Sequence, residues 1–373
     1  MKGMCVMFAE KQILLIPGPT PVPPRVLRAM CRPMINHRGP EYESFFEQLL
    51  SKLRAVFGTK GDVIVFPASG TGAMEAAVAN LLSPGDAVLA TSIGHFGDRF
   101  ADIASAFGAD VKVLSFPWGK AVEIEEVERA FKSADKTYRA LLVTHNETST
   151  GVTNPIQPLA KLARENEALL IVDAISSLGA IELPMDDWDV DVVIGGSQKG
   201  LMTPPGLSFV ALNERAWEAV ERAKMPRYYW DFKLHKRYME RHQNPYTPAL
   251  PLLFALDEAL DMLFEDGLSN VYARHERMKQ IVRNGIREIG MGLGLLADDD
   301  VASNTVTGVT LPEGLDGGAV VKKLREEHNV IVAGGMDHMR GKMIRIGHVG
   351  WVHENDLLIA LNALKEVITS LLK

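Results

Sequence analysis

The chain contains little cysteine: Cys5 and Cys31 are the only two among 373 residues. Two thiols cannot cross-link a chain of this length, so we expect a protein of a reducing compartment, the cytoplasm. No HExxH motif and no CxxC pair occurs, which leaves a metal site without support. Long hydrophobic runs are also missing. The first apolar stretch stops at Glu10 and Lys11, far short of the roughly 18 residues of a membrane span, so we expect a tail over residues 1–11 and no membrane partner.

Positive charge is scarce relative to negative charge, since 40 Lys and Arg face 47 Asp and Glu, for a net charge of −7. A surface that binds nucleic acid without regard to sequence needs an excess of Lys and Arg, so we expect no nucleic-acid partner. No run of five like charges occurs, which argues against charged tails. With 47% hydrophobic residues the chain can bury a large core, and its length favours two domains.

Short apolar runs alternate with amphipathic stretches between Asp62 and Val210, a pattern typical of βαβ units and a mostly parallel sheet. We therefore predict a large α/β domain over residues 12–266. Ser208–Leu212 has no room for a crossover helix before it, so this strand is expected to be antiparallel. The seven predicted strands are Asp62–Phe66, Ala87–Thr91, Val111–Ser115, Ala140–Thr144, Leu169–Asp173, Val190–Ile194 and Ser208–Leu212.

The pattern changes to α+β toward the carboxyl terminus, which predicts a smaller domain over residues 267–373. Long helices are expected over Leu252–Glu265 and Val271–Ile289, and the chain ends in a predicted helix, Glu354–Leu371. Near the other end, Pro17–Pro24 holds five prolines in eight residues, so it can be neither helix nor central strand. A stiff linker is one interpretation of this segment.

Two buried-looking strands end in charged side chains. Leu169–Asp173 ends in an acid, and the strand before Gly195 leads to Lys199. Ligands of open α/β sheets bind at the carboxyl ends of the strands. An acid and a lysine there suit pyridoxal phosphate, because the amine forms a Schiff base with the cofactor aldehyde and the carboxylate pairs with the pyridine nitrogen. The alternatives are a solvated surface lysine and an aspartate that caps the next helix.

Three further positions carry chemistry but stay open on the residues alone. Ser69, Gly70 and Thr71 lie in a turn from strand to helix, where they could bind a phosphate or simply cap the helix. His145 could be a core histidine or a general base. Arg345 interrupts an apolar strand, so it could grip a substrate carboxylate or pair with an internal acid.

Taken together, the chain resembles the class V aminotransferases, which are pyridoxal phosphate enzymes with the aspartate aminotransferase fold (fold type I). The resemblance runs from about Leu14 to near the carboxyl end and is closest to the alanine–glyoxylate, serine–pyruvate and serine–glyoxylate branch. It depends on eight motifs in order: PGPTPVP, HR at His37 and Arg38, SGTGAMEA, HNETSTG, IVDAISS, GSQKGLMTPPG, YTPA and RIGHVG.

This resemblance implies roles for individual residues. Lys199 and Asp173 match the catalytic lysine and the partner of the pyridine nitrogen, and Arg345 matches the residue that binds the substrate carboxylate. Thr247 matches a residue that reaches the phosphate from the neighbouring subunit, which implies a homodimer with shared active sites. Some relatives have a tyrosine where this chain has Asn244. The implied cofactor-binding residues are Ser69, Gly70, Thr71, Phe96, Thr148, Asp173, Ile175, Gln198, Lys199 and Thr247.

The implied function is a ping-pong transaminase that moves an amino group from alanine or serine to glyoxylate or pyruvate. Another amine, such as aminoethylphosphonate, phosphoserine or pyridoxamine, is an alternative donor. A cysteine desulfurase would need a reactive cysteine on a late loop, where this chain has none. An NAD(P)-binding oxidoreductase has only the βαβ pattern in its favour, and the combination of Asp173, Lys199 and Arg345 argues against a catalytically silent protein.

Overall fold

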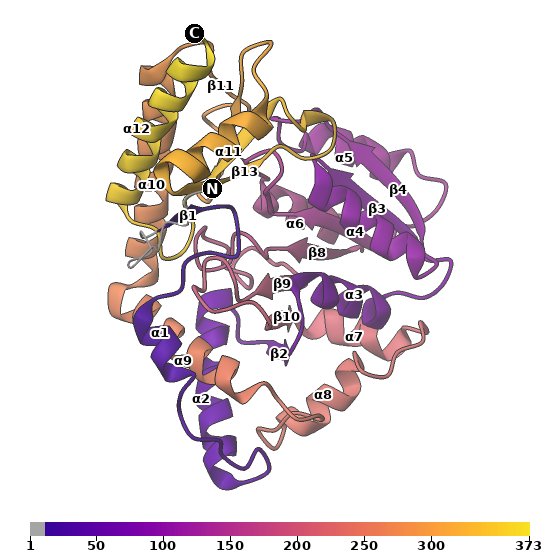
Figure 1. Cartoon of the computed structure of the whole chain (residues 1–373). Helices are drawn as coiled ribbons and strands as arrows, with labels where there is room; N and C mark the ends of the chain where they lie inside the picture. The colour runs from indigo at the N-terminus through magenta and orange to yellow at the C-terminus, as the bar shows by residue number, and fades with distance from the viewer. Residues whose placement is uncertain (1–11) are drawn as a thin grey trace.

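The computed structural model describes residues 12–373, so the expected tail over residues 1–11 lies outside the described residues. Two sheets organise the chain. A seven-stranded sheet forms the centre of the large unit, and a five-stranded sheet with the orange and yellow helices lies beside it (Figure 1). No helix in the described range 12–373 combines the length and apolar character needed to cross a membrane.

The large sheet is mixed but mostly parallel. Its first strand β2 pairs antiparallel with β10, β10 pairs antiparallel with β9, and the other neighbours are parallel. The prediction of seven strands, with Ser208–Leu212 antiparallel, is therefore confirmed. In spatial order the strands are β2 (Asp62–Phe66), β10 (Ser208–Leu212), β9 (Val192–Gly196), β8 (Leu169–Asp173), β5 (Ala140–Thr144), β3 (Ala87–Ser92) and β4 (Asp110–Ser115).

The predicted strand Val190–Ile194 begins two residues later, at Val192, and runs to Gly196. The side chain of Asp191 explains the shift. It accepts the backbone N–H of Leu170 at 2.9 Å and pairs with Arg215 at 3.1 Å, so it closes the loop before the strand. The apolar pattern of the sequence includes Val190 in the strand, because it carries no information about the contact of Asp191 with Leu170 in the neighbouring strand.

Helices cover both faces of the large sheet. The chain moves one way across the sheet through α3 (Gly70–Leu81) and α4 (His95–Ala106), and back through α5 (Ile124–Lys132) and α6 (Ile156–Glu165). Because parallel crossovers are right-handed, the two directions put the two pairs of helices on opposite faces. The strands between them are buried on both sides, which is why they consist of almost unbroken apolar residues.

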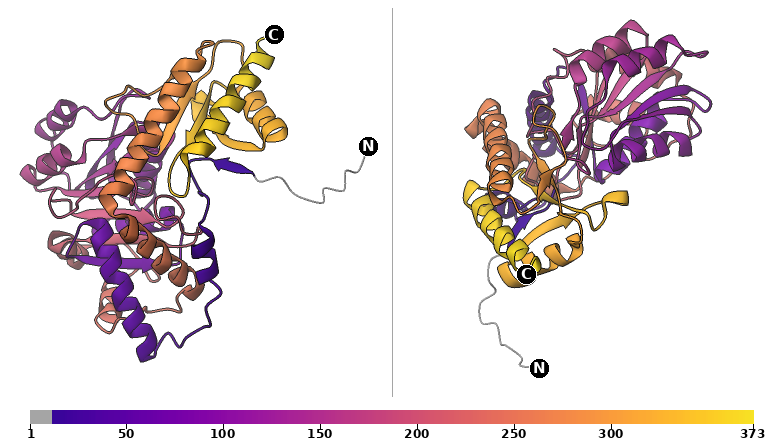
Figure 2. Two further views of the ribbon diagram at one scale, coloured as in Figure 1. Left: turned by 90° about the vertical axis from the view of Figure 1, so that its left-hand side faces the viewer. Right: turned by 90° about the horizontal axis from the view of Figure 1, so that it is seen from above.

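The small sheet has the order β1 (Ile13–Leu15), β13 (Val330–Gly334), β14 (Met343–Gly347), β12 (Val306–Thr310) and β11 (Gly294–Leu295). Helices α10 (Leu268–Ile289), α11 (Gly317–His328) and α12 (Glu354–Leu371) pack in this part, and α10 and α12 lie side by side (Figure 2). Leu15 belongs to the small core, although the sequence analysis expected the large domain to begin at residue 12. β1 joins this sheet because it pairs in parallel with β13.

Five further α-helices, a hairpin and a short 3-10 turn complete the described chain. The helices α7 and α8 were not expected, because they are short and largely polar; their signals are the caps Asn213 and Asp231, whose side chains accept backbone N–H groups of the first turn. The elements are α1 (Pro24–Ala29), α2 (Pro40–Phe57), β6 (Asn146–Glu147) with β7 (Val152–Thr153), α7 (Glu214–Arg222), α8 (Phe232–Met239), α9 (Leu250–Asp266) and the 3-10 turn η1 (Asp337–Met339).

Candidate active site

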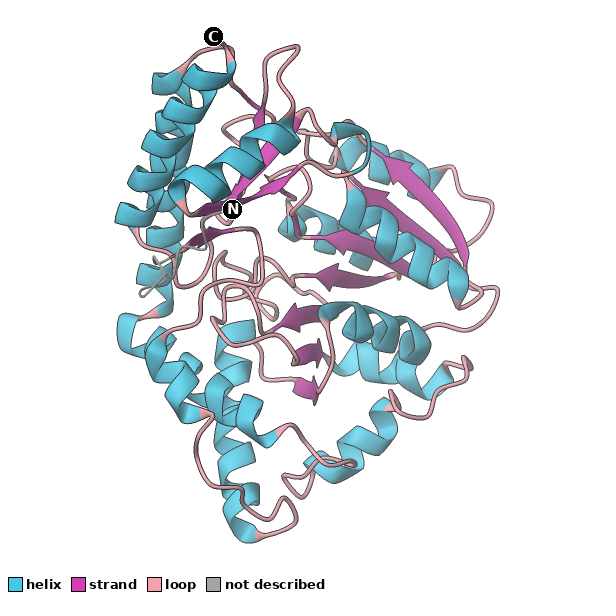
Figure 3. Ribbon diagram, viewed as in Figure 1, coloured by secondary structure: helices cyan, strands magenta, loops and turns pink. Residues whose placement is uncertain are grey.

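Asp173 and Lys199 face one cavity at the carboxyl edge of the large sheet. Asp173 ends β8, beside Ile194 of β9, and Lys199 follows β9 by three residues. In Figure 3 the arrowheads of the parallel strands of the large sheet point toward the loops between the two sheets, where this edge lies, whereas the antiparallel β10 points the other way. The cavity has a volume of about 110 Å³ and is lined by Ser69, Gly70, Thr71, Met74, Phe96, Arg99, Asn146, Thr148, Asp173, Ile175, Ser176, Gln198 and Lys199.

Burial shifts the pKa of both charged groups toward neutrality. Lys199 is 9% exposed, and desolvation is the main reason that its pKa falls to about 8; the nearby Arg345 and Arg99 lower it further, while Asp173 raises it. Desolvation raises the pKa of Asp173 to about 6, against the opposing effects of the Ile175 N–H and of Lys199. The solvated surface lysine of the sequence analysis is therefore wrong, and so is an Asp173 that caps a following helix, because its carboxylate accepts only the N–H of Ile175, at 2.9 Å, in a turn.

The turn before α3 presents backbone N–H groups and hydroxyls to the cavity. Ser69 is the N-cap residue of α3, yet its side chain makes no capping hydrogen bond, which contradicts the simple capping interpretation. A Cβ at Gly70 would lie 2.5 Å from Cδ1 of Ile175, so a larger residue there would displace the Ile175 side chain. The positive end of α3 and these free donors suit an anion such as a phosphate group.

Phe96 and Arg99 extend the cavity from the first turn of α4. The Lys199 ammonium lies 5.7 Å from the centre of the Phe96 ring, and the Arg99 guanidinium lies 4.9 Å from it. Arg99 also donates to Nε2 of His95 at 3.0 Å, so the His95 proton is on Nδ1, which lies 3.0 Å from Asp337 of the small domain. The sequence analysis missed Arg99, although its place one helical turn after Phe96 is a signal that could have found it.

Arg345 enters the site from β14. It is 9% exposed, and its guanidinium donates to the carbonyl oxygens of Gly334 at 2.9 Å and Thr148 at 3.2 Å. Within residues 12–373, no carboxylate lies at ion-pair distance from it, which contradicts the salt bridge to an internal acid. Its remaining donors are therefore available to a ligand.

The proline-rich segment packs against the lysine. Gly18 adopts φ +147°, and a Cβ added there would lie 3.0 Å from Cε of Lys199. The Thr20 hydroxyl donates to the Lys199 carbonyl at 3.3 Å. The segment thus packs against Lys199 rather than serving only as a linker. The motif PGPT predicted an irregular backbone, but only the tertiary structure brings it to the lysine.

Thr247 does not line the cavity of its own chain; it is exposed. The loop before it is anchored by Arg38 of the HR motif, which donates to the carbonyl oxygens of Asn244 and Pro245. Asn244 also accepts the Tyr42 hydroxyl, so it has a structural role where some relatives have a tyrosine. The prediction that Thr247 reaches a neighbouring subunit stays a prediction.

His145 belongs to the core. It is 2% exposed, its Nδ1 lies 2.9 Å from the Ser177 hydroxyl, and burial lowers its pKa to about 4. It does not line the cavity. Of the two interpretations left open by the sequence, the general base is therefore not supported.

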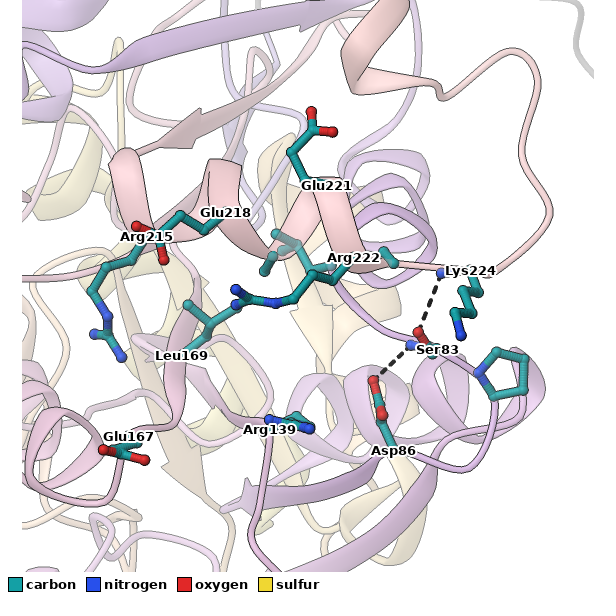
Figure 4. Close-up of a pocket in the computed structure, with 14 residues that line it drawn as sticks. Ser83, Asp86, Arg139, Glu167, Leu169, Arg215, Glu218, Glu221, Arg222 and Lys224 are labelled. Carbon is teal, nitrogen blue, oxygen red and sulfur yellow. Dashed lines mark hydrogen bonds between the residues drawn. The ribbon is translucent and has the colours of Figure 1, made fainter.

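A larger cavity, of about 740 Å³, lies at the opposite edge of the sheet (Figure 4). Asp86, Arg139 and Leu169 in its wall lie at the amino ends of β3, β5 and β8. Acidic side chains, including Glu218 and Glu221, alternate there with arginines. Active sites of such sheets lie at the carboxyl ends of the strands, so size alone does not mark the functional site.

Residues 13–349 match the family model "Aminotransferase class-V". The chain is 38% identical to the soluble hydrogenase small subunit of Synechococcus, over 97% of this chain and 94% of that protein. It is 40% identical to a serine–glyoxylate aminotransferase of Methylorubrum extorquens, over 93% and 89% of the two chains. The crystal structure of an alanine–glyoxylate aminotransferase from Nostoc superposes with a TM-score of 0.92 at 34% identity, covering 98% of this chain and 97% of the other.

Proposed function

We propose a function for this chain from the premise that it belongs to the class V aminotransferase family, a membership that implies pyridoxal phosphate as the cofactor. We propose that it transfers the amino group of alanine or serine to glyoxylate or pyruvate by a ping-pong mechanism. The observation that carries the proposal is the shared cavity of Asp173 and Lys199, whose pKa values are shifted toward each other by burial. Proton transfer near neutral pH requires groups whose pKa values lie near the working pH, as these do.

The donor set fits pyridoxal phosphate. The unused donors at the start of α3 suit its phosphate group, with Ser69, Gly70, Thr71 and Gln198 as the proposed ligands. Phe96 and Ile175 offer apolar surfaces for the two faces of the ring, and Thr148 a hydroxyl beside it. The second carboxylate oxygen of Asp173 is open to the pyridine nitrogen. Bound in this way, the cofactor supplies a protonated ring that withdraws electrons from the substrate Cα.

Lys199 is proposed as the residue that moves protons. A pKa near 8 leaves part of the lysine population neutral at neutral pH, so its amine can accept the proton from Cα of the donor. Asp173 assists because its negative charge favours a protonated ring nitrogen. Arg345 has free donors for the substrate carboxylate, and the contact of Gly18 with the lysine stem limits where the amine can move.

The proposed enzyme is a homodimer in the cytoplasm. Support for the dimer is indirect: Thr247 is exposed, and Arg38 holds the loop that presents it. Analytical ultracentrifugation tests whether the protein is a dimer. The substitution Thr247→Ala should weaken the binding of pyridoxal phosphate while the protein stays dimeric.

A panel of half-reactions tests the function. Each amino acid is mixed with cofactor-loaded enzyme without an acceptor, and loss of the yellow absorbance band is followed with time. Alanine and serine should bleach the band fastest, and glyoxylate or pyruvate should restore it. Lys199→Ala should abolish both the band and turnover. Retention of both in that variant would refute the assignment.

A donor with a second anionic group is the alternative that an observation favours. Arg99 lines the cavity, and within residues 12–373 it contacts Nε2 of His95 and the Phe96 ring and forms no ion pair with a carboxylate. A guanidinium without a carboxylate suits a phosphonate or phosphate group. Faster bleaching by aminoethylphosphonate or phosphoserine than by alanine would favour this reading.

A further inference from the structure

Glu147 is a fully buried carboxylate behind the cavity, on the short strand β6. Four donors surround it. One oxygen accepts the backbone N–H groups of Phe96 and Gly97, both at 3.0 Å, and the other accepts the N–H and the hydroxyl of Ser149 at 3.0 and 2.6 Å. Among residues 12–373 no basic side chain lies at ion-pair distance from it. Buried carboxylates without a cation are rare, so this arrangement needs an explanation.

The first contact is a helix cap supplied from a distant part of the chain. Helix α4 leaves its first backbone N–H groups without partners, and its N-cap residue Gly94 has no side chain to satisfy them. A Cβ at Gly94 would lie 2.3 Å from Oγ of Ser149 and 2.7 Å from Cγ of Glu147. The space of an ordinary N-cap side chain is therefore occupied by Ser149, whose hydroxyl accepts the His95 N–H at 3.1 Å, and by Glu147, whose negative charge also suits the positive end of the helix.

The second contact shapes the loop after β6. Ser149 is held by Glu147, and Thr148 between them lines the cavity. The carbonyl of Thr148 accepts a hydrogen bond from Arg345 at 3.2 Å. The Glu147 carboxylate thus connects two parts of the site. It accepts the backbone N–H of Phe96, whose ring faces Lys199, and it holds the loop of Thr148, whose carbonyl accepts a hydrogen bond from Arg345.

The carboxylate is also coupled electrostatically to the site. All four of its contacts are donors, so a protonated carboxyl would leave its own O–H facing an N–H or hydroxyl. Desolvation raises the pKa of Glu147 above its ordinary value, although the four hydrogen bonds oppose the shift and favour the charged form. Its charge in turn raises the pKa values of Lys199, Asp173 and Arg345.

We propose that Glu147 is a positioning residue of the active site, which caps α4 from outside so that Phe96 is held at one face of the cofactor ring and Thr148 beside it, and which adds a negative charge near Lys199. The proposal depends on the function proposed above. Because Glu147 does not line the cavity, it acts through these neighbours and is not a catalytic residue.

The test compares Glu147→Gln with the wild type as apo-protein and with pyridoxal phosphate. A glutamine keeps one acceptor but turns its NH₂ group toward a donor, so one pair of hydrogen bonds is lost. We expect the Kd for pyridoxal phosphate, measured by absorbance titration, to rise at least about tenfold, which corresponds to about 1.4 kcal/mol. The pH midpoint of the visible absorbance of the bound cofactor should move lower, because a negative charge beside the lysine is removed.

Glu125→Gln is the matched control, since Glu125 is an exposed acid in the first turn of α5. It should leave both readouts unchanged. If Glu147→Gln lowers only the melting temperature, with the Kd and the pH midpoint as in the wild type, the residue is merely structural and the proposal is overturned.

Ser149→Ala decides the matter if Glu147→Gln does not fold. It removes the hydroxyl that donates to Glu147 and accepts the His95 N–H at 3.1 Å, while the carboxylate keeps its other three contacts. A Kd raised about threefold or more supports the proposal, and an unchanged Kd overturns it. If the wild type itself binds no pyridoxal phosphate, the proposed function fails instead, so the two failures are distinguishable.

Discussion

Acid should destabilise the fold through His348, and the size of the effect follows from its surroundings. His348 is fully buried; its Nδ1 lies 3.0 Å from the Asn304 carbonyl and its Nε2 3.0 Å from the Thr307 hydroxyl. The neutral ring donates from Nδ1 and accepts at Nε2. Burial is the main reason that its pKa falls to about 3. A proton on Nε2 would face a buried hydroxyl in a site that excludes water.

The unfolded chain binds that proton near pH 6.5, whereas the folded chain does not bind it until about pH 3. The contribution of His348 is therefore complete above pH 6.5 and is lost as the pH falls toward 3. At pH 5.5 the unfolded state gains about RT ln 11, or about 1.4 kcal/mol, relative to the folded state. His348→Gln removes this linkage.

Urea titrations of the wild type and His348→Gln at pH 7.5 and 5.5, at one cofactor concentration, measure the effect. The variant should be less stable at pH 7.5, and the difference in free energy of unfolding should shrink by about 1.4 kcal/mol at pH 5.5. His338→Gln, at an exposed position, is the control. An equal difference at both pH values would refute the reasoning, because it would mean that His348 takes up its proton in the folded state too.

The site predicts three more outcomes. Gly18→Ala should lower kcat/KM at least about tenfold, because the new methyl group would meet the Lys199 stem at 3.0 Å in a backbone conformation that disfavours alanine; wild-type activity would contradict this packing. Arg345→Lys should raise KM for the amino donor about 10- to 100-fold with a smaller effect on kcat, since an ammonium cannot replace a two-pronged donor; unchanged saturation would count against its role. Arg38→Lys should raise the Kd for the cofactor severalfold in an absorbance titration, because it releases the loop before Thr247. An unchanged Kd would show that this loop does not contribute to cofactor binding.

Secondary structure in the middle of the large sheet was predictable because its central strands are buried on both faces. Leu169–Asp173 and Ala140–Thr144 have the bounds that their apolar runs predicted. The strand before Lys199 was misplaced by two residues, because Asp191 makes its contacts with residues far along the chain. Local pattern therefore predicted where strands exist, and long-range hydrogen bonds decided where this one begins.

The sequence by itself determined the type of chemistry, because an acid and a lysine at the ends of neighbouring parallel strands must meet at one sheet edge. Only the tertiary structure decided what surrounds them. The stem of Lys199 lies under Gly18, far away in the chain, and Phe96 is set by Glu147 from another strand loop. Such contacts depend on side-chain packing between segments that periodicity and motif spacing treat as independent. The pKa values of Asp173 and Lys199 follow from the same packing, since burial, which no local pattern measures, is their main cause.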